Sequence, residues 1–176
     1  YYMNPNNLVI DNYGNIYWNN EMALTYYKSA DKKTGDAPGF DNIFPDAMCY
    51  DETADFFYAV GYSYSDYCYH LVKFQCSEEG PADECVDYRI NKLPEGSYIS
   101  SFAIRKNNIY FCSSEEDQDG RYNVIYKAAM KFGEDTVETD GGQPVIDVVT
   151  LQYSKEITRF NFNNSKQVNP KSLQGE

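Results

Sequence analysis

A threefold internal repeat constrains the fold of this chain more than any other feature. Each copy is an apolar strand, a tight polar turn and a second strand rich in Tyr and Phe, over residues 8–18, 48–58 and 102–111. The matching tyrosines, Tyr17, Tyr58 and Tyr110, lie 41 and 52 residues apart. A period of this length with hairpins inside it predicts the four-stranded blades of a β-propeller.

Further strand patterns complete each repeat, and no segment has a helical period. The expected strands are residues 8–11, 16–19, 23–28 and about 40–44; then 48–51, 56–61, 67–74 and 86–90; then 100–105, 109–113, 124–130 and 145–149; and finally 149–153 and 157–163. The sequence therefore predicts an all-β domain over residues 8–163. Its units are about 8–46, 47–98, 99–149 and a partial 150–163, between an N-terminal extension (1–7) and a polar tail (164–176).

Three and a half blades do not make a closed propeller, which has four to eight, and an open array exposes strand edges. Three arrangements remain open at this point. The chain can be part of a larger propeller, or its last half-blade can pair with the N-terminal segment or with another copy. The fold can also be a two-sheet β-sandwich.

Composition limits the partners that this chain can bind. Its net charge is −12, and an acidic field repels nucleic acid and anionic membrane surfaces. No apolar run is long enough to span a bilayer. The chain begins at Tyr1 without Met, as a trimmed secreted protein or a fragment would, and Asn163 opens a glycosylation sequon. We expect an extracellular or cell-surface location.

The five cysteines include no C-x-x-C pair, which argues against zinc or thioredoxin-like chemistry. Cys76 and Cys85 flank an acidic loop between two expected strands, so we predict a disulfide between them. Cys49 and Cys68 fall on the first and third strands of one unit, roughly 9–10 Å apart and beyond the ~7 Å limit for bridging. An odd number leaves at least one thiol free or paired outside this chain.

The first unit resembles the repeats of the NHL and YWTD propeller families. In those families an apolar strand ending in Asp precedes a Gly-Asn-like turn and an aromatic strand, as at Asp11 and Gly14 here. The resemblance covers about a dozen residues per unit, roughly a third of the chain. Arg105 stands where the first two units have Asp11 and Asp51, and no unit has the full Tyr-Trp-Thr-Asp string. The resemblance implies propeller topology and transfers no ligand or catalytic residue.

An acidic segment from Glu115 to Asn123 is a candidate calcium loop. Oxygen ligands alternate along it and a glycine occupies its sixth place, so Asp117, Asp119 and Asn123 are candidate Ca²⁺ ligands. A similar loop occurs in integrin-type propellers, on a different hairpin. The first place is Glu rather than Asp, and the twelfth is Tyr126 rather than Glu. The alternative is a hairpin in which Asp119 and the following glycine form the turn.

Catalytic candidates are few. His70 is the only histidine, and Cys68 lies two residues away on the same strand face, which is poor geometry for a dyad. A structural role for His70 is therefore favoured. Asp11 and Asp51 end inner strands, where they can line a central channel or cap local turns. There is no Gly-rich phosphate loop, and basic residues are scattered.

These observations predict a non-enzymatic binding or scaffolding module for a protein or glycan ligand, because Tyr-rich loops on a rigid scaffold suit recognition. The alternative function is a calcium-dependent hydrolase, lactonase-like or carbohydrate-active, that uses inner-strand carboxylates. A structural surface-layer or adhesive component is a third possibility, in which strands of neighbouring copies pair laterally.

Overall fold

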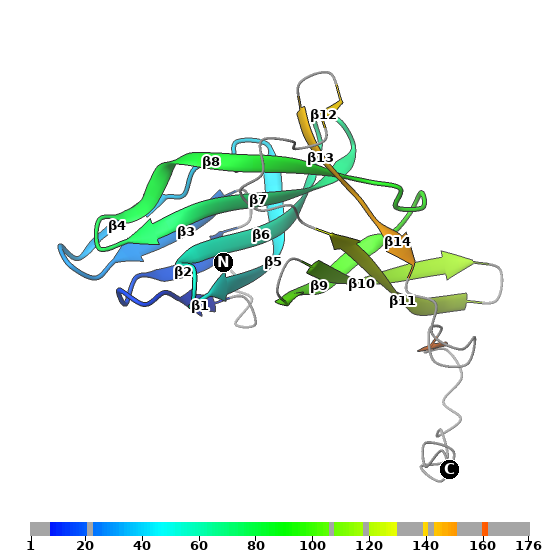
Figure 1. Cartoon of the computed structure of the whole chain (residues 1–176), viewed down its shortest axis with the longest axis horizontal. Helices are drawn as coiled ribbons and strands as arrows, with labels where there is room; N and C mark the ends of the chain where they lie inside the picture. Colours follow the sequence, from blue (N-terminus) through cyan, green and yellow to red (C-terminus); the bar gives the residue numbers. More distant parts are fainter. Residues whose placement is uncertain are drawn as a thin grey trace, which may run out of the picture.

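A computed structural model describes residues 8–20, 23–105, 108–117, 120–129, 139–140, 143–150 and 160–161. Every helix or strand assigned in these residues is a β-strand, which confirms the expected all-β class (Figure 1). The strands form three sheets, and none of the sheets closes into a barrel. Nowhere in these ranges is there a helix long and apolar enough to cross a membrane.

Sheet 1 is an antiparallel meander in the order β1-β2-β3-β4. Its strands are β1 (Leu8–Ile10), β2 (Ile16–Asn20), β3 (Ala23–Lys28) and β4 (Lys33–Asp36). The fourth strand was expected at about residues 40–44, and that prediction is wrong. Phe40, 3% exposed, instead fills the core between sheets 1 and 2, and Ile43 begins the next strand.

Sheet 2 contains a second antiparallel meander, extended at one edge by later segments. The meander consists of β5 (Ile43–Asp51), β6 (Phe56–Ser63), β7 (Cys68–Ser77) and β8 (Gly80–Asn91). β13 (Gln143–Asp147) pairs in parallel with β8, and β12 (Thr139–Asp140) pairs with β13. The order is β12-β13-β8-β7-β6-β5.

Sheet 3 consists of β9 (Tyr98–Arg105), β10 (Asn108–Asp117) and β11 (Gly120–Ala129), with β14 (Val149–Thr150) and β15 (Phe160–Asn161) both paired to β11. Residues 145–149 were expected as the fourth strand of the third unit. Instead, Figure 1 shows the segment in orange running from β8 to β11, so it joins sheets 2 and 3. Ile146 and Val148 are 5% and 3% exposed, and burying them in the core between these sheets favours this path. The described parts of the expected fourth unit, β14 and β15, both pair with β11 of sheet 3.

The three sheets stack face to face in chain order, with sheet 2 in the middle. Alternate residues of β6 enter opposite cores, as the two-residue period of a strand requires. Phe57 and Ala59 pack with sheet 1, whereas Tyr58 and Val60 pack with sheet 3. All four are at most 2% exposed. Sheet 2 is therefore buried on both faces.

The matching tyrosines lie on the second strand of each sheet and define one face, here called the tyrosine face; the opposite one is the rear face. Tyr17 points to sheet 2 and Tyr58 to sheet 3. Tyr110 alternates with the buried Ile109 and Phe111, so it lies on the outer face of sheet 3. The tyrosine faces of sheets 1 and 2 thus pack against the rear faces of sheets 2 and 3, respectively.

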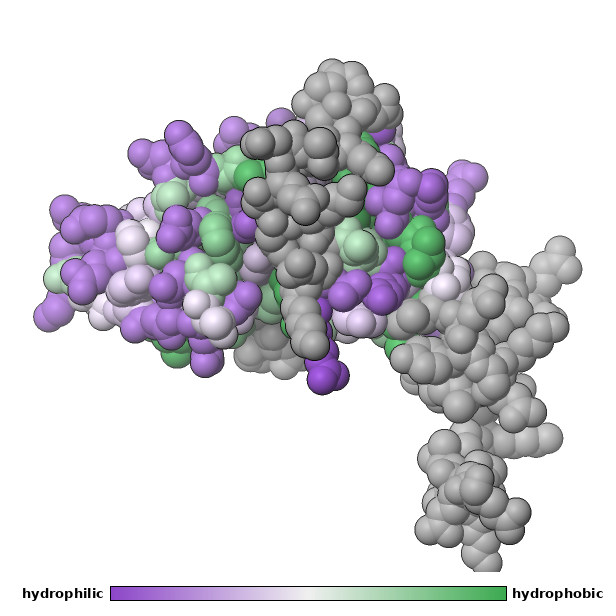
Figure 2. All heavy atoms as spheres, viewed as in Figure 1, coloured by the Kyte–Doolittle hydropathy of each residue, from purple (hydrophilic) through white to green (hydrophobic). Residues whose placement is uncertain are grey.

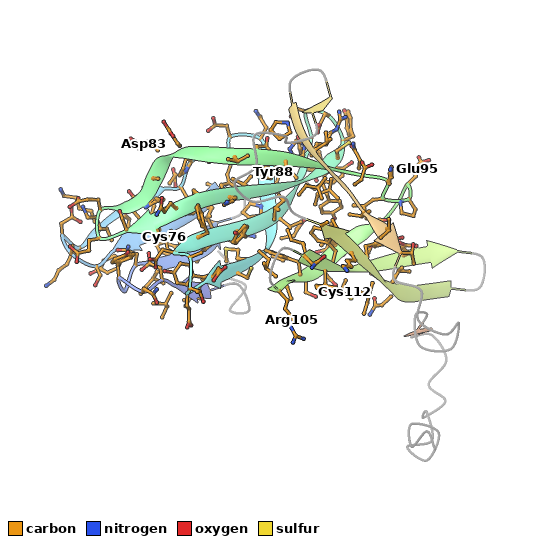
Figure 3. The ribbon with its side chains drawn as sticks, in the orientation of Figure 1. Cys76, Asp83, Tyr88, Glu95, Arg105 and Cys112 are labelled. Atoms are coloured by element: carbon orange, nitrogen blue, oxygen red, sulfur yellow. The ribbon has the colours of Figure 1, made fainter. Side chains whose placement is uncertain are left out.

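All five cysteines lie in the described residues and are free thiols, so the predicted Cys76–Cys85 disulfide is absent. The strand register explains why. Cys76 stands opposite Pro81 and Cys85 opposite Phe74, because the β7–β8 ladder shifts between the two positions. Cys76 is 1% exposed, and burial raises its pKa to about 12. Figure 3 shows Cys76 on sheet 2 and Cys112 on sheet 3, well separated.

Candidate ligand-binding groove

A β-bulge on β5 places a carboxyl group outside the regular ladder. Pro45 pairs with Gly61 and Ala47 with Val60, so Asp46 is the extra residue between them. Bulges re-aim side chains and are common next to active sites. A Cβ at Gly61 would lie 2.3 Å from the backbone oxygen of Phe44, so only glycine fits opposite this bulge.

Asp46 lines an open groove of about 1040 Å³ at one end of sheet 2, beside the start of sheet 3. Strands β5, β6 and β7 form one side, and the β8–β9 loop forms the other. Figure 3 labels Glu95 in this loop, at the far end of β8 from Asp83. About a third of the residues that line the groove are aromatic: Phe44, Tyr62, Tyr64, Tyr67, Tyr69 and Tyr98.

The rings of the groove form a connected edge-to-face series. Tyr64 meets Phe44 at 4.9 Å between ring centroids, with an interplanar angle of 83°. Tyr62 meets Tyr64 at 5.3 Å and 83°, and Tyr69 at 5.3 Å and 70°. Such contacts stabilise ring pairs by about 0.5–1.5 kcal/mol each. The aromatic wall is therefore held in place before any ligand arrives.

Two further rings stand at the mouth of the groove with much of their surface free. Tyr67 is 73% exposed and Tyr98 is 53% exposed. Tyr67 also has φ of 60°, in the left-handed region that non-glycine residues avoid. Strain of this kind collects at ligand-binding sites. These two rings are available to contact a bound molecule.

Burial sets the protonation of Asp46. Removal from water disfavours its charged form and raises its pKa to about 6. Its charge also contributes, after burial, to the raised pKa of Tyr69 and of Tyr98. A carboxyl group with a raised pKa in an aromatic groove is a recognised sign of a functional site.

Sheet 1 contributes one polar residue to the same groove. The Nδ2 of Asn19 donates a hydrogen bond to the carbonyl oxygen of Pro45, at the bulge. The Oδ1 of Asn19 is buried and accepts no hydrogen bond within the described part of the chain. An unsatisfied buried acceptor costs about 1–3 kcal/mol. A ligand hydroxyl group that reached this oxygen would remove that cost.

Only part of the candidate calcium loop lies within the described residues. The β10–β11 ladder continues to the pair Asp117–Gly120, and Asn123 pairs with Ser114 within it. Asp119 and the side chain of Asp117 lie outside the described residues, as does Asn163. Among the residues described, no three His, Cys, Asp or Glu side chains gather closely enough to hold a metal ion. The calcium loop and the glycosylation site stay predictions.

His70 has a structural environment, as the sequence favoured. It is 5% exposed, and its Nδ1 lies 2.7 Å from Asp87 and its Nε2 2.9 Å from Asp66. Burial lowers the pKa of His70, but the hydrogen bonds and charges of the two carboxylates outweigh it, so the pKa is raised. The two acidic partners therefore favour the protonated form of His70.

Asp11, just after β1, and Asp51, at the end of β5, cap local turns. Oδ1 of Asp11 accepts hydrogen bonds from the backbone amides of Tyr13 and Asn15, each at 2.9 Å. Its Oδ2 accepts from the Tyr17 hydroxyl at 3.0 Å. Oδ1 of Asp51 accepts from the amide of Thr53 at 2.9 Å. This is the turn-capping role that the sequence offered as an alternative to a channel lining.

Sequence reasoning missed the groove, although one signal was present. A glycine inside a strand pattern indicates a bulge or a close backbone approach, and Gly61 is such a residue. Gly61 alone does not identify the bulged residue, because that depends on which strand pairs with β6 and in which register. Asp46 was therefore not singled out.

Comparison with known proteins adds no relative. Neither protein-family models nor the curated proteins contain a match to this chain.

Proposed function

We propose that this chain is a binding module that holds a neutral oligosaccharide in the tyrosine-lined groove. The observation that carries the proposal is the bulged, partly buried Asp46 within a groove of pre-arranged aromatic rings. Its ligand class follows from the chemistry of the rings, of the polar groups beside them and of the overall charge.

The exposed rings favour a flat ligand with polarised C–H groups. The face of a tyrosine ring is electron-rich and attracts the weakly positive hydrogens of a sugar ring. Tyr67 and Tyr98 offer such surfaces at the mouth of the groove. Tyrosine also loses little side-chain entropy on binding, which suits a recognition surface.

Two polar side chains of the groove are hydrogen-bond acceptors. Asp46 in its charged form accepts hydrogen bonds only, and the buried Oδ1 of Asn19 accepts as well. Sugar hydroxyl groups supply such donors at close spacing. The net charge of −12 repels anionic ligands over long range, which favours an uncharged sugar.

The scaffold in this proposal is propeller-like, with sheets 1, 2 and 3 as successive blades of a secreted or cell-surface protein. Two observations support it. The sheets stack in chain order through equivalent faces, and the first strand of sheet 2 contacts the first strands of both other sheets. In propellers the first strands of the blades surround a common axis.

The proposal is tested by screening the full chain against an array of neutral oligosaccharides and measuring the best binder by calorimetry. Tyr67→Ala and Tyr98→Ala should each weaken binding at least tenfold. Ala keeps the Cβ of Tyr67, so the backbone strain at that residue is unchanged. Tyr13→Ala, a partly exposed tyrosine outside the groove, is the matched control and should bind as the wild type does. Equal binding by all three variants would contradict the proposal.

The same experiment separates binding from hydrolysis. A carbohydrate-active hydrolase would cleave the bound oligosaccharide, and the products would appear by mass spectrometry during the titration. A binding module leaves the ligand intact. Adding and chelating Ca²⁺ during the titration tests whether the alternative, calcium-dependent function applies.

A further inference from the structure

The rear face of sheet 1 carries large apolar side chains that belong to neither core cluster of the described residues. Leu8 and Ile10 are 56% and 55% exposed. Trp18 stands opposite Leu8 and Ile16 opposite Ile10, so the four side chains share one face. Contiguous exposed apolar surface of this kind marks interaction sites. Figure 2 shows only small, separate hydrophobic areas over the parts of the surface coloured in that view.

The internal repeat indicates what covers such a face. Ile16 and Trp18 flank the first matching tyrosine. The residues that flank the other two matching tyrosines are 0% exposed, and each is covered by the tyrosine face of the preceding sheet: Phe57, Ala59, Ile109 and Phe111. Because the three sheets repeat one another, we expect the rear face of sheet 1 to pack against a tyrosine face as well. No sheet in the described part of the chain covers it in this way.

Sheet 3 carries such a face at the other end of the stack. Its Tyr110 stands opposite Lys127, as Tyr58 of sheet 2 stands opposite Lys73. Lys127 Nζ lies 5.9 Å from the ring centroid of Tyr110, and Lys73 Nζ lies 6.0 Å from that of Tyr58. The outer face of sheet 3 therefore repeats the lysine–tyrosine pair of the face that sheet 2 presents to sheet 3.

We infer that a second copy of this chain covers the rear face of sheet 1 with the tyrosine face of its own sheet 3. The two required faces are both present on one chain, at opposite ends of its stack. Their charges are complementary: Lys127 lies on one face, and Asp36 lies on the other, hydrogen-bonded to Thr25. The contact joins unlike surfaces, so copies associate head to tail.

Two copies joined in this way contain six stacked sheets, within the range of four to eight at which propellers close. The contact lies outside the groove and does not depend on its ligand. Because each chain carries a net charge of −12, repulsion opposes association, and added salt should strengthen it.

Sedimentation velocity of the full chain over a wide concentration range tests this inference. The wild type should reach twice the 20.3 kDa of one chain, or a larger head-to-tail assembly, more readily at higher salt. Trp18→Asp and Tyr110→Asp should each remain at the mass of one chain. Tyr13→Asp is the control. Tyr13 is 37% exposed in the turn between β1 and β2, outside both faces and outside the groove, and the variant should associate as the wild type does.

Mixing the two face variants distinguishes this contact from any symmetric one. Trp18→Asp retains the intact tyrosine face and Tyr110→Asp the intact rear face, so their mixture should associate through one contact. Ile10→Asp, at a half-exposed position, replaces Trp18→Asp if circular dichroism shows that variant unfolded. A wild type that stays at 20.3 kDa at every concentration would overturn the inference, as would rear-face variants that associate normally.

Discussion

Replacing Gly61 by Ala should remove the bulge that presents Asp46. The new Cβ would lie 2.3 Å from the carbonyl oxygen of Phe44 and 2.7 Å from a methyl group of Ile43, whereas ordinary contacts begin near 3.4 Å. The first contact is with backbone, so the strands must separate by about 1 Å. Overpacking of this kind costs about 1–3 kcal/mol, and the lower entropy of the unfolded chain returns only about 0.4–1 kcal/mol. We expect a net loss of about 1–2 kcal/mol.

Urea unfolding of the two proteins under the same conditions measures this loss. Gly14→Ala is the matched control, because Gly14 lies outside the groove, has φ of 79°, and its added Cβ would make only ordinary contacts, the nearest at 3.6 Å. Its cost is backbone strain of about 1–2 kcal/mol, less the same entropy return, which leaves about 1 kcal/mol. Gly61→Ala should also weaken oligosaccharide binding, whereas Gly14→Ala leaves the bulge and the groove intact. A Gly61→Ala variant as stable as the wild type would show that the bulge does not depend on this glycine.

Three further predictions follow from the charged residues. Oligosaccharide affinity should fall as the pH drops through about 6, because protonation of Asp46 removes a charged acceptor, and Asp46→Asn should flatten the profile; an unchanged wild-type profile would separate Asp46 from binding. The pKa of His70 is raised in the folded state, so its interactions stabilise the fold fully below the unfolded pKa of about 6.5, and this stabilisation is lost as the pH rises through the folded-state pKa. Urea unfolding at a series of pH values should show this loss of stability in the wild type and not in His70→Ala. Asp11→Ala should lower the free energy of unfolding by about 3 kcal/mol, because it removes a buried carboxylate with several hydrogen bonds, whereas Asp51→Ala should lower it by only about 1 kcal/mol. Equal losses of stability in urea unfolding would contradict these roles.

The repeat explains why much of the fold was predictable. Strand periodicity is local, and Tyr17, Tyr58 and Tyr110 each occupy the second strand of a sheet, as their alignment suggested. Turn capping by Asp11 was also foreseeable, because an aspartate at the start of a turn bonds amides two to four residues ahead.

The rest depended on contacts between distant segments. Nothing in the sequence near β13 indicates that it pairs in parallel with β8, more than fifty residues earlier. The register shift that separates Cys76 from Cys85 is a property of the paired strands, and so is the bulge at Asp46. The groove consequently has no contiguous motif, because its rings come from β5, β6, β7, β9 and a turn.

Saturation-transfer difference NMR tests whether the tyrosine-lined groove binds an oligosaccharide. With the best binder from the array, irradiation of the aromatic protons should transfer saturation to the C–H face of one sugar ring. The transfer should disappear in the double variant Tyr67→Ala/Tyr98→Ala while its fold, judged by circular dichroism, is retained. Transfer of equal strength in a folded double variant would place the ligand outside the groove.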